Sequence, residues 1–428
     1  MGVKFENHRL VLAACVLARL RRGETMATLP YVTVDAFTSV KFGGNPAAVV
    51  IFPKEDLARA LETRKEQEKA KNHEVRWTYG CMPARTALAG KDGFPPDAFL
   101  ANVAKEMNLS ETAFVKPRPP PRRAQQPAAE REAESESSDA ESSVASGKKR
   151  RDEPDHMDFD LRWFTPSGAE VDLCGHATLA TAHALFELGP GAVPPETHLR
   201  FHTRSGVLVV SPVGDGQLEL SFPASPPTMT LIGGRDVRVV DSDGEEEPDP
   251  ELDFSPADVA AALGMPPSAA ATIRIVGRND VGDTFCVLPD PKTLVEVKPN
   301  LAKIAALGGR GLVATAPGGV ATKQGGEPVD FTCRFWGPNI GIPEDPVTGS
   351  AFCGLAPYWK KELGRKGGEE MIGYQASARG GLVRAACVKH KAAFGGEDET
   401  RVHIRGRAVS VMKGEILGDG FAADEPER

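Results

Sequence analysis

The chain has 428 residues, of which 41% are hydrophobic and 26% charged, so it is long enough for two or three domains with buried cores. Its net charge of −8 argues against a nucleic-acid-binding protein that neutralises phosphates. No apolar run approaches the roughly 18 residues of a membrane-spanning helix. The seven cysteines form no C-x-x-C pair, which favours neither a disulfide framework nor a zinc site and fits a cytoplasmic protein.

Residues 1–28 are predicted to lie outside the fold. A short apolar run, Leu10–Leu20, is flanked by Arg9 and by Arg21 and Arg22. This pattern fits an organelle-targeting leader or a disordered extension, with Met26 as an alternative start. We therefore exclude the segment from the folded part.

The first predicted elements are two strands and a helix. Tyr31–Phe37 alternates as a strand does, and Ala47–Phe52 is a compact apolar run that follows the turn residues Gly43–Pro46. Residues 55–91 are rich in charge and lack an apolar stripe, so we expect a solvated insertion. Pro95–Met107 has helical periodicity and ends at Asn108.

Residues 117–156 form the second predicted insertion. Prolines are followed by glutamates and serines and then by four basic residues, Lys148–Arg151. Such a composition cannot bury enough apolar surface to fold, so we expect disorder. The basic run fits a solvated charge cluster or a nuclear signal. We also expect a surface loop at Asp241–Glu251 and a tail at 419–428.

An internal repeat is the most informative feature. Arg162–Pro166 is echoed by Arg334–Pro338, each with a basic residue, two aromatic residues, one spacer and a proline. An alanine-rich apolar segment follows in each case and opens at Gly175 or Gly349. Each segment then gives way to a turn and a strand, at Arg204–Leu208 and Arg379–Val383.

Four landmarks in the same order predict two structurally similar halves related by pseudo-symmetry. The alanine-rich helices, His176–Leu188 and Ser350–Leu363, are apolar nearly all round, so we expect sheet to surround each of them. Their glycine-led starts expose N–H groups that have no helical partner. If the halves face each other, both starts point into a shared cleft that suits a small carboxylate-bearing ligand.

Four side chains near these landmarks are candidates for chemistry. Glu111 lies among apolar residues, where burial would suit it to proton transfer, although a capping or turn role fits as well. Cys174 precedes the first helix start, where it is either a reactive thiol or a small buried apolar residue. His176 is a catalytic or a structural histidine. Asp345 is either a helix cap or the opposing acid/base.

Other classes of chemistry lack their motifs. The sequence has no dinucleotide fingerprint after a strand, no Walker A sequence and no H-E-x-x-H pair. The remaining cysteines carry no motif and the histidines are scattered, so we predict no metal and no cofactor. What remains is a cofactor-free proton-transfer enzyme.

The motifs resemble those of the phenazine biosynthesis PhzF-like family. The resemblance covers Tyr31 to about Leu417 outside the two insertions. It is carried by Val34–Phe37, Gly44–Ala48, Asn108–Phe114, Phe164–Pro166, Asp172–Thr178, Glu344–Ala351, Gln375–Ser377 and Arg379–Gly381.

The resemblance implies an α+β fold like that of diaminopimelate epimerase. Two pseudo-symmetric domains, each a curved sheet or barrel around a central helix, would enclose the site in the cleft between them. We assign residues 29–200 to the first half and 201–400 to the second. The last strand, at 401–418, is expected to return to the first half. A homodimer is a candidate assembly.

The resemblance also implies cofactor-independent isomerisation by proton transfer at a carbon beside a carboxylate. Its catalytic residues match Glu111, His176 and Asp345. Cys174 occupies the place of the first cysteine of the epimerase relatives, but the second half has Asp345 and Thr348 instead of a second cysteine, which favours a mechanism centred on Glu111. We list Asn45, Ser110, Gly175, Thr348, Gly349 and Ser350 as substrate-binding.

Two other functions stay open from the sequence. One is a catalytically silent interaction or regulatory protein that uses the long Ser/Glu-rich loop to bind a partner. The other is a dehydratase of hydroxy amino acids, which a single active-site cysteine, Cys174, would fit. The substrate itself is not predicted.

Overall fold

The computed structural model describes residues 28–52, 94–118, 156–187, 193–227, 229–230, 238–240, 246–247, 254–320, 328–390 and 399–417. The extension at 1–27, the insertion at 55–91, nearly all of the insertion at 117–156, most of the acidic segment at 241–251 and the tail at 419–428 lie outside the described residues.

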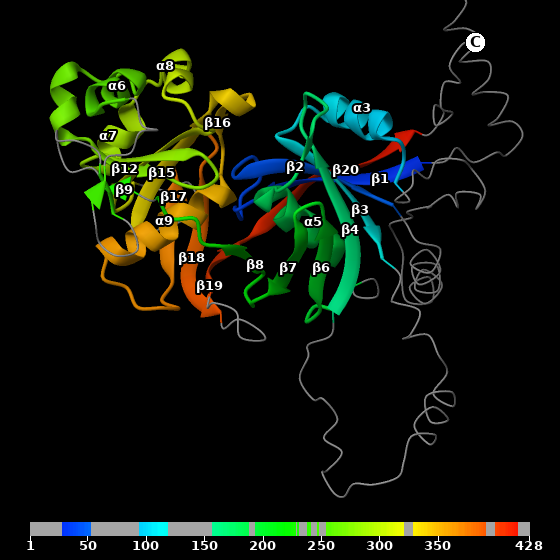
Figure 1. Ribbon diagram of the computed structural model, residues 1–428. Coiled ribbons are helices and arrows are strands. Elements are labelled where there is room, and N and C mark those ends of the chain that lie inside the picture. The colour runs from blue at the N-terminus through cyan, green and yellow to red at the C-terminus, as the bar shows by residue number, and fades with distance from the viewer. Residues whose placement is uncertain are drawn as a thin grey trace, which may run out of the picture.

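The first lobe surrounds helix α5 with strands (Figure 1). Its elements are β1 (Thr28–Ala36), β2 (Asn45–Ile51), α3 (Asp97–Met107), β3 (Glu111–Pro117), β4 (His156–Phe164), β5 (Glu170–Val171), α5 (Gly175–Glu187), β6 (His198–Thr203), β7 (Gly206–Pro212) and β8 (Leu218–Pro223). The predicted helix begins two residues later than expected, after Pro96, and ends at Asn108 in the left-handed conformation.

The second lobe holds helix α9 against strands β18 and β19, with α6, α7 and α8 at its outer end (Figure 1). Its elements are α6 (Pro256–Ala262), a 3-10 helix at Pro267–Thr272, β12 (Arg274–Arg278), β13 (Asp283–Val287), α7 (Pro291–Glu296), α8 (Leu301–Ala306), β14 (Gly311–Pro317), β15 (Phe331–Gly337), a 3-10 turn at Pro338–Ile340, β16 (Ile342–Asp345), α9 (Gly349–Glu362), β17 (Met371–Gln375) and β18 (Gly381–His390). Short strands β9 (Met229–Thr230), β10 (Arg238–Val240) and β11 (Glu246–Glu247) form a separate small sheet.

Strand pairing repeats between the two lobes. In the first, β2 is parallel to β3 and β4 is parallel to β6, while the other pairs from β1 to β8 are antiparallel. In the second, β13 is parallel to β14 and β15 is parallel to β17, and the other pairs from β12 to β18 are antiparallel. The two alanine-rich helices therefore follow equivalent strands.

The last two strands join the lobes. Strand β19 (Glu399–Gly406) pairs with β18 on one side and with β8 on the other. Strand β20 (Ala408–Leu417) then runs antiparallel to β1, as Figure 1 shows, so the last described strand lies beside the first described strand. We expected a strand at 401–418 to return to the first half, and this pairing is the contact that bears on it.

The expected boundary at residue 200 does not coincide with a change of lobe. Strands β7 and β8 follow that residue, yet both contact α5, and β6 pairs with β4. They are held there because the apolar side chains of Val210, Leu220 and Phe222 belong to the same buried cluster as the residues of α5. The elements around α5 therefore continue to Pro223.

The two central helices are buried because their residues are small and uncharged. Nine of the thirteen residues of α5 are buried, and the hydroxyls of Thr178 and Thr181 donate to carbonyls one turn earlier. In α9, Phe352 and Trp359 pack against Phe331 of β15. None of the described helices is long and apolar enough to cross a membrane.

Phe37 packs against the chain where β19 leads into β20, close to the start of α9. It has a positive φ of 61°, and a Cβ added at Gly406 would overlap its ring. The far side of the ring reaches the start of α9, where a Cβ on Gly349 would lie 3.8 Å from Phe37 Cζ. The sequence thus needs glycine at 406 to let the last strands cross close to the helix start.

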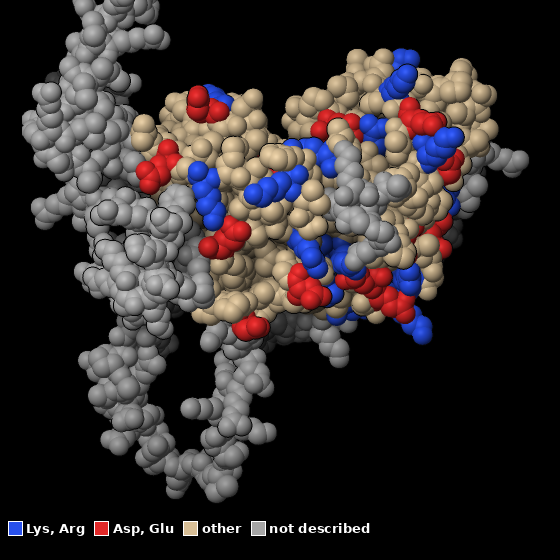
Figure 2. Space-filling model, turned by 180° about the vertical axis from the view of Figure 1, so that it is seen from behind, with Lys and Arg blue, Asp and Glu red and all other residues tan. Residues whose placement is uncertain are grey.

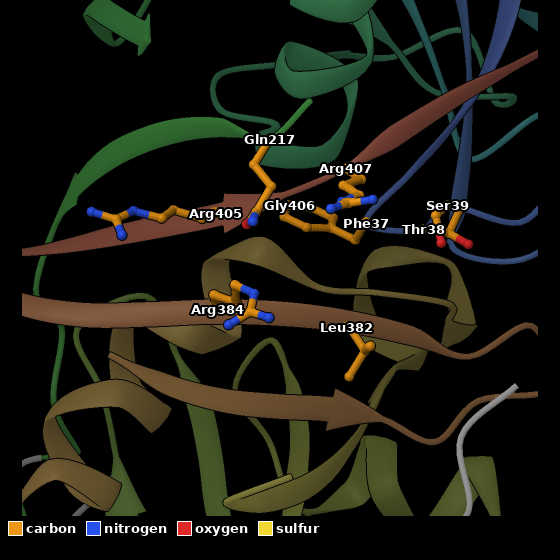
Figure 3. Close-up of a pocket in the computed structure, with 9 residues that line it drawn as sticks. All are labelled: Phe37, Thr38, Ser39, Gln217, Leu382, Arg384, Arg405, Gly406 and Arg407. Atoms are coloured by element: carbon orange, nitrogen blue, oxygen red, sulfur yellow. The ribbon is translucent and has the colours of Figure 1, made fainter. Parts of the chain in front are cut away.

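Phe37 also lines a small cavity of about 160 Å³ at this crossing (Figure 3). Arginines contribute to its wall, but the guanidinium of Arg405 extends along its own strand, where it pairs with Glu219 and Glu370. The cavity therefore offers no converging set of cationic donors. On the face seen in Figure 2, basic and acidic side chains are likewise interspersed.

Candidate active site

Two helix starts meet at one cavity of about 480 Å³. Gly175 begins α5 and Gly349 begins α9, and a Cβ added to either glycine would lie 3.7 Å from the Cα of the other. The first N–H groups of a helix have no helical partner, and the helix dipole adds positive potential there. The meeting point therefore attracts a small anion.

Glu111, His176 and Cys174 form a chain of contacts on the α5 side. The Nε2 atom of His176 lies 3.0 Å from Oε2 of Glu111, and its Nδ1 atom lies 3.6 Å from Sγ of Cys174. All three residues are at least nine-tenths buried. Neither Oε2 of Glu111 nor Nε2 of His176 has a hydrogen-bond partner in good geometry among the described residues, so the 3.0 Å contact between them is what holds both at the cavity.

The neighbours of His176 favour the charged form of its imidazole. Burial disfavours its charged form, but the negative charges of its two neighbours outweigh burial and raise the pKa well above the usual value. Burial also raises the pKa of the Cys174 thiol, and the charge of Glu111 adds to this rise. Burial thus favours the neutral thiol of Cys174, while the interactions with Cys174 and Glu111 favour the charged imidazole of His176.

Asp345 ends β16 and approaches from the α9 side. Burial raises its pKa to about 6, where the positive charge of His176 opposes the rise and the negative charge of Glu111 adds to it. The Oδ1 atom accepts a hydrogen bond of 2.8 Å from Nδ2 of Asn45, and Oδ2 accepts one of 2.6 Å from the hydroxyl of Thr348. A carboxyl group with this pKa exchanges protons close to neutral pH.

A polar network fixes Asp345 from behind. The Asn45 amide also donates to the carbonyl of Val347 and accepts from the hydroxyl of Ser110. The Gln375 amide donates to the backbone carbonyl of Asp345 at 2.7 Å and accepts from the backbone N–H of Thr348 at 2.8 Å. Each buried amide is therefore satisfied on both sides, which holds the carboxyl group in one orientation.

Comparison with known proteins identifies the family. The family described as "Phenazine biosynthesis-like protein" matches residues 95–414. The chain belongs to this family. It is 31% identical to an uncharacterized isomerase of Halalkalibacterium halodurans, over 92% of this chain and all of that protein, and 30% identical to the mouse phenazine biosynthesis-like domain-containing protein 1, over 91% and 99%.

A solved structure agrees in fold. The crystal structure of a PhzF-family protein from Enterococcus faecalis superposes with a TM-score of 0.55 at 30% identity and covers 91% of this chain and 99% of that one. The predicted family is thus confirmed, as is a mixed α+β fold of the PhzF type. The relatives' names support an isomerase-type function for this PhzF-like protein.

Most of the predicted site residues of the PhzF-like protein lie together. Eight of them line the cavity: Glu111, Cys174, Gly175, His176, Asp345, Thr348, Gly349 and Ser350. The structure places the other two differently. Asn45 is fully buried behind Asp345, and Ser110 donates to Asn45, so both position the carboxyl group instead of lining the cavity.

Three further residues of the site carry no recognisable signal in the sequence. Arg310 lines the cavity from a glycine-rich turn before β14, and Phe335 contributes an apolar wall. Cys353 also lines the cavity, although no motif surrounds it. The sequence offers one feature that could have drawn attention to Arg310: it is a single charged residue between Gly309 and Gly311, outside any predicted helix or strand.

The ligand-bearing atoms of Glu111, Cys174 and His176 all lie within 4.8 Å of one another, a spacing that a metal ion can bridge. However, Nδ1 of His176 faces the sulfur and Nε2 faces the carboxylate. To bind one metal ion together with the sulfur and the carboxylate, His176 would have to direct a single ring nitrogen toward the point between them. In a proton relay each ring nitrogen contacts one neighbour, as it does here. The donor set therefore fits proton transfer better than metal binding.

Proposed function

We propose that this protein is a cofactor-independent isomerase that moves a proton at a carbon beside the carboxylate of a small acid, with Glu111 as general acid/base. The observation that carries the proposal is the carboxyl group of Glu111, buried against His176 at the cavity where the starts of α5 and α9 meet. A base of this kind must reach the migrating proton, and an anion site beside it must hold the carboxylate.

The proposed reaction is balanced without a co-reactant. Oε2 of Glu111 takes a proton from the substrate carbon, and the electron pair of the broken C–H bond moves into the carboxylate, which becomes an enolate. The N–H groups at the starts of α5 and α9 stabilise the added negative charge. A proton is then delivered to a different carbon, or to the opposite face of the same one, so the composition of the substrate is unchanged. When Asp345 is the donor, Glu111 releases its proton to solvent and Asp345 takes one up from solvent before the next turnover.

His176 and Asp345 have separate roles in this proposal. The imidazole of His176 contacts Oε2 of Glu111 at 3.0 Å and is our candidate for the residue that orients this base. Asp345, with a pKa of about 6, is our candidate for the acid that protonates the intermediate from the α9 side. Cys174 contacts His176 and is our candidate for a residue that holds the imidazole in place.

The repeated strand pairing supports a pseudo-symmetric description of the two halves, with the substrate bound between them. Each half then supplies one helix start, and the chemistry differs because Glu111 lies on one side and Asp345 on the other. A symmetrical two-thiol mechanism does not fit this pair of walls, since Thr348 stands where a second cysteine would.

The test is hydrogen exchange with solvent. Pools of small amino acids and unsaturated carboxylic acids are incubated with the protein in D2O and followed by proton NMR. Exchange or migration at the carbon beside the carboxylate is expected, and Glu111→Gln should lower the rate by about 10²- to 10⁴-fold. Glu219→Gln is the control, because Glu219 is similarly buried and pairs with Arg405 and His403 away from the cavity.

The outcomes separate the candidate functions. Equal rates in wild type and Glu111→Gln would remove Glu111 from the mechanism. Loss of water from a hydroxy amino acid would identify a dehydratase. No exchange with any acid in the pools would favour a non-catalytic protein.

A further inference from the structure

One cation of the cavity wall takes no part in the proton transfer. Arg310 precedes β14 and lines the cavity with its side chain about three-quarters buried. Its Nε and Nη2 atoms donate to the two oxygens of Asp283, at 2.7 and 2.5 Å, and Asp283 is fully buried at the start of β13. The guanidinium also lies against the ring of Phe335, 5.3 Å from the ring centre.

The same guanidinium orients a hydroxyl at the start of α9. Nη2 of Arg310 donates to Oγ of Ser350 at 2.9 Å, so the hydroxyl hydrogen of Ser350 is left to donate elsewhere. Nη1 of Arg310 makes no hydrogen bond to any other described residue. The charged Nη1 group of Arg310 and the hydroxyl of Ser350 therefore remain available as donors on the cavity wall, beside the unpaired N–H groups of α9.

We propose that Arg310, together with Ser350, binds the carboxylate of the substrate and restricts this protein to free acids, excluding esters and amides. The inference rests on the proposed function, because it takes this cavity as the place where the substrate binds. Arg310 is the specificity-determining residue, and Asp283 is a positioning residue that acts through it.

Charge explains why an arginine held in this way is needed. The carboxyl groups of Glu111, Glu170, Asp172 and Asp345 line the cavity, and among the described residues that line it His176 and Arg310 are the ones that can carry positive charge. A substrate carboxylate would be repelled there unless donors of positive charge met it directly. Arginine supplies donors in a fixed plane, and the paired bonds to Asp283 fix that plane, so Nη1 is held in one place and keeps its hydrogens available for a ligand.

Position also favours this assignment. Ser350 follows Gly349, so the anchor lies at the start of α9, next to the meeting point of the two helices. A carboxylate bound there places the neighbouring carbon between the α5 wall, which carries Glu111, and the α9 wall, which carries Asp345. The anchor therefore sets the register of the substrate between base and acid.

The experiment measures binding of benzoate and of benzamide, its uncharged isostere, by NMR titration. Neither molecule can be isomerised, so the result is independent of turnover. Wild type is expected to bind benzoate in preference to benzamide. Arg310→Met should weaken benzoate binding by about 10- to 100-fold, because a hydrogen bond to a charged group is lost, and should leave benzamide binding within twofold.

Companion variants guard against misfolding. Arg310→Met leaves the buried Asp283 unpaired, so the double variant Asp283→Asn with Arg310→Met removes both charges together, and Ser350→Ala disturbs neither. The double variant should bind benzoate as weakly as Arg310→Met does. Ser350→Ala should weaken benzoate binding several-fold. Arg384→Met is the control: Arg384 is similarly buried, pairs with Glu370 at 2.6 Å and lines the separate cavity of Figure 3.

Benzoate binding that is unchanged in both Arg310→Met and the double variant would overturn the inference, as would a wild type that does not distinguish benzoate from benzamide. Loss of discrimination in Arg384→Met as well would also overturn it. If Glu111→Gln keeps full hydrogen exchange while Arg310→Met loses benzoate binding, the proposed mechanism fails but the carboxylate site at Arg310 stands. If Glu111→Gln loses exchange while Arg310→Met still binds benzoate, the mechanism stands and the carboxylate site at Arg310 is wrong.

Discussion

Asp345 is expected to destabilise the folded protein at neutral pH, and Asp345→Asn is expected to stabilise it. Burial raises the pKa of this carboxyl group from 3.8 to about 6. Between those values the folded state binds the proton more tightly than the unfolded state does. The free energy of unfolding therefore falls as pH rises through this window, by about 3 kcal/mol at 1.36 kcal/mol per pKa unit.

Asparagine has nearly the same shape and no charge to bury. Its Oδ1 atom can accept from Asn45 as before, and its amide can donate to the hydroxyl oxygen of Thr348. The variant should therefore match wild type near pH 4 and become more stable by up to about 3 kcal/mol at pH 7. Urea unfolding between pH 4 and 7.5, followed by fluorescence of the four tryptophans, measures the difference.

Thr348→Val is the companion variant for this measurement. It removes the 2.6 Å hydrogen bond to Asp345 but keeps the carboxyl group. Because that bond lowers the pKa, its loss should raise the pKa further and steepen the fall in stability with pH. Wild type and Asp345→Asn curves that run parallel from pH 4 to 7.5 would refute the assigned burial effect.

Two further predictions concern the α5 wall and the strand crossing. Cys174→Ala should keep solvent exchange within about tenfold, because the raised pKa of the thiol makes it a poor base at neutral pH; a loss of more than 10³-fold in the NMR assay would make it the base instead. Gly406→Ala should lower the free energy of unfolding by about 1–3 kcal/mol, because the added Cβ overlaps the Phe37 ring. Gly367→Ala, where a Cβ would make only an ordinary 3.9 Å contact with the Cys387 carbonyl oxygen, is its control, and equal urea midpoints for both variants would contradict the account.

The sequence predicted the elements whose residues follow a simple local rule. Strands β1 and β2 alternate or are uniformly apolar, α3 ends at an asparagine in the left-handed conformation, and α5 and α9 are small-residue helices that open at glycine. The repeated landmarks also led to the meeting of Gly175 and Gly349, because equivalent strands deliver equivalent helix starts.

What could not be predicted depends on contacts between distant segments. The lobe boundary was misplaced because strand patterns in β7 and β8 do not say which helix they cover. We expected Asn45 to contact the substrate, but its side-chain amide donates hydrogen bonds to Asp345 and to the carbonyl of Val347, which are about three hundred residues away in the sequence. Arg310 has no local pattern at all: its role is set by Asp283 and Ser350, which reach it from two other elements.

The two walls of the cavity have charges that respond to the substrate in different ways. On the α5 wall, the imidazole of His176 contacts the carboxyl group of Glu111 directly at 3.0 Å. On the α9 wall, burial and the charge of Glu111 raise the pKa of Asp345, while the charge of His176 and the hydrogen bonds from Thr348 and Asn45 oppose the rise. A carboxylate bound at Arg310 would raise that pKa further. In the proposed mechanism, binding the substrate thus favours the protonated form of Asp345, which later donates that proton.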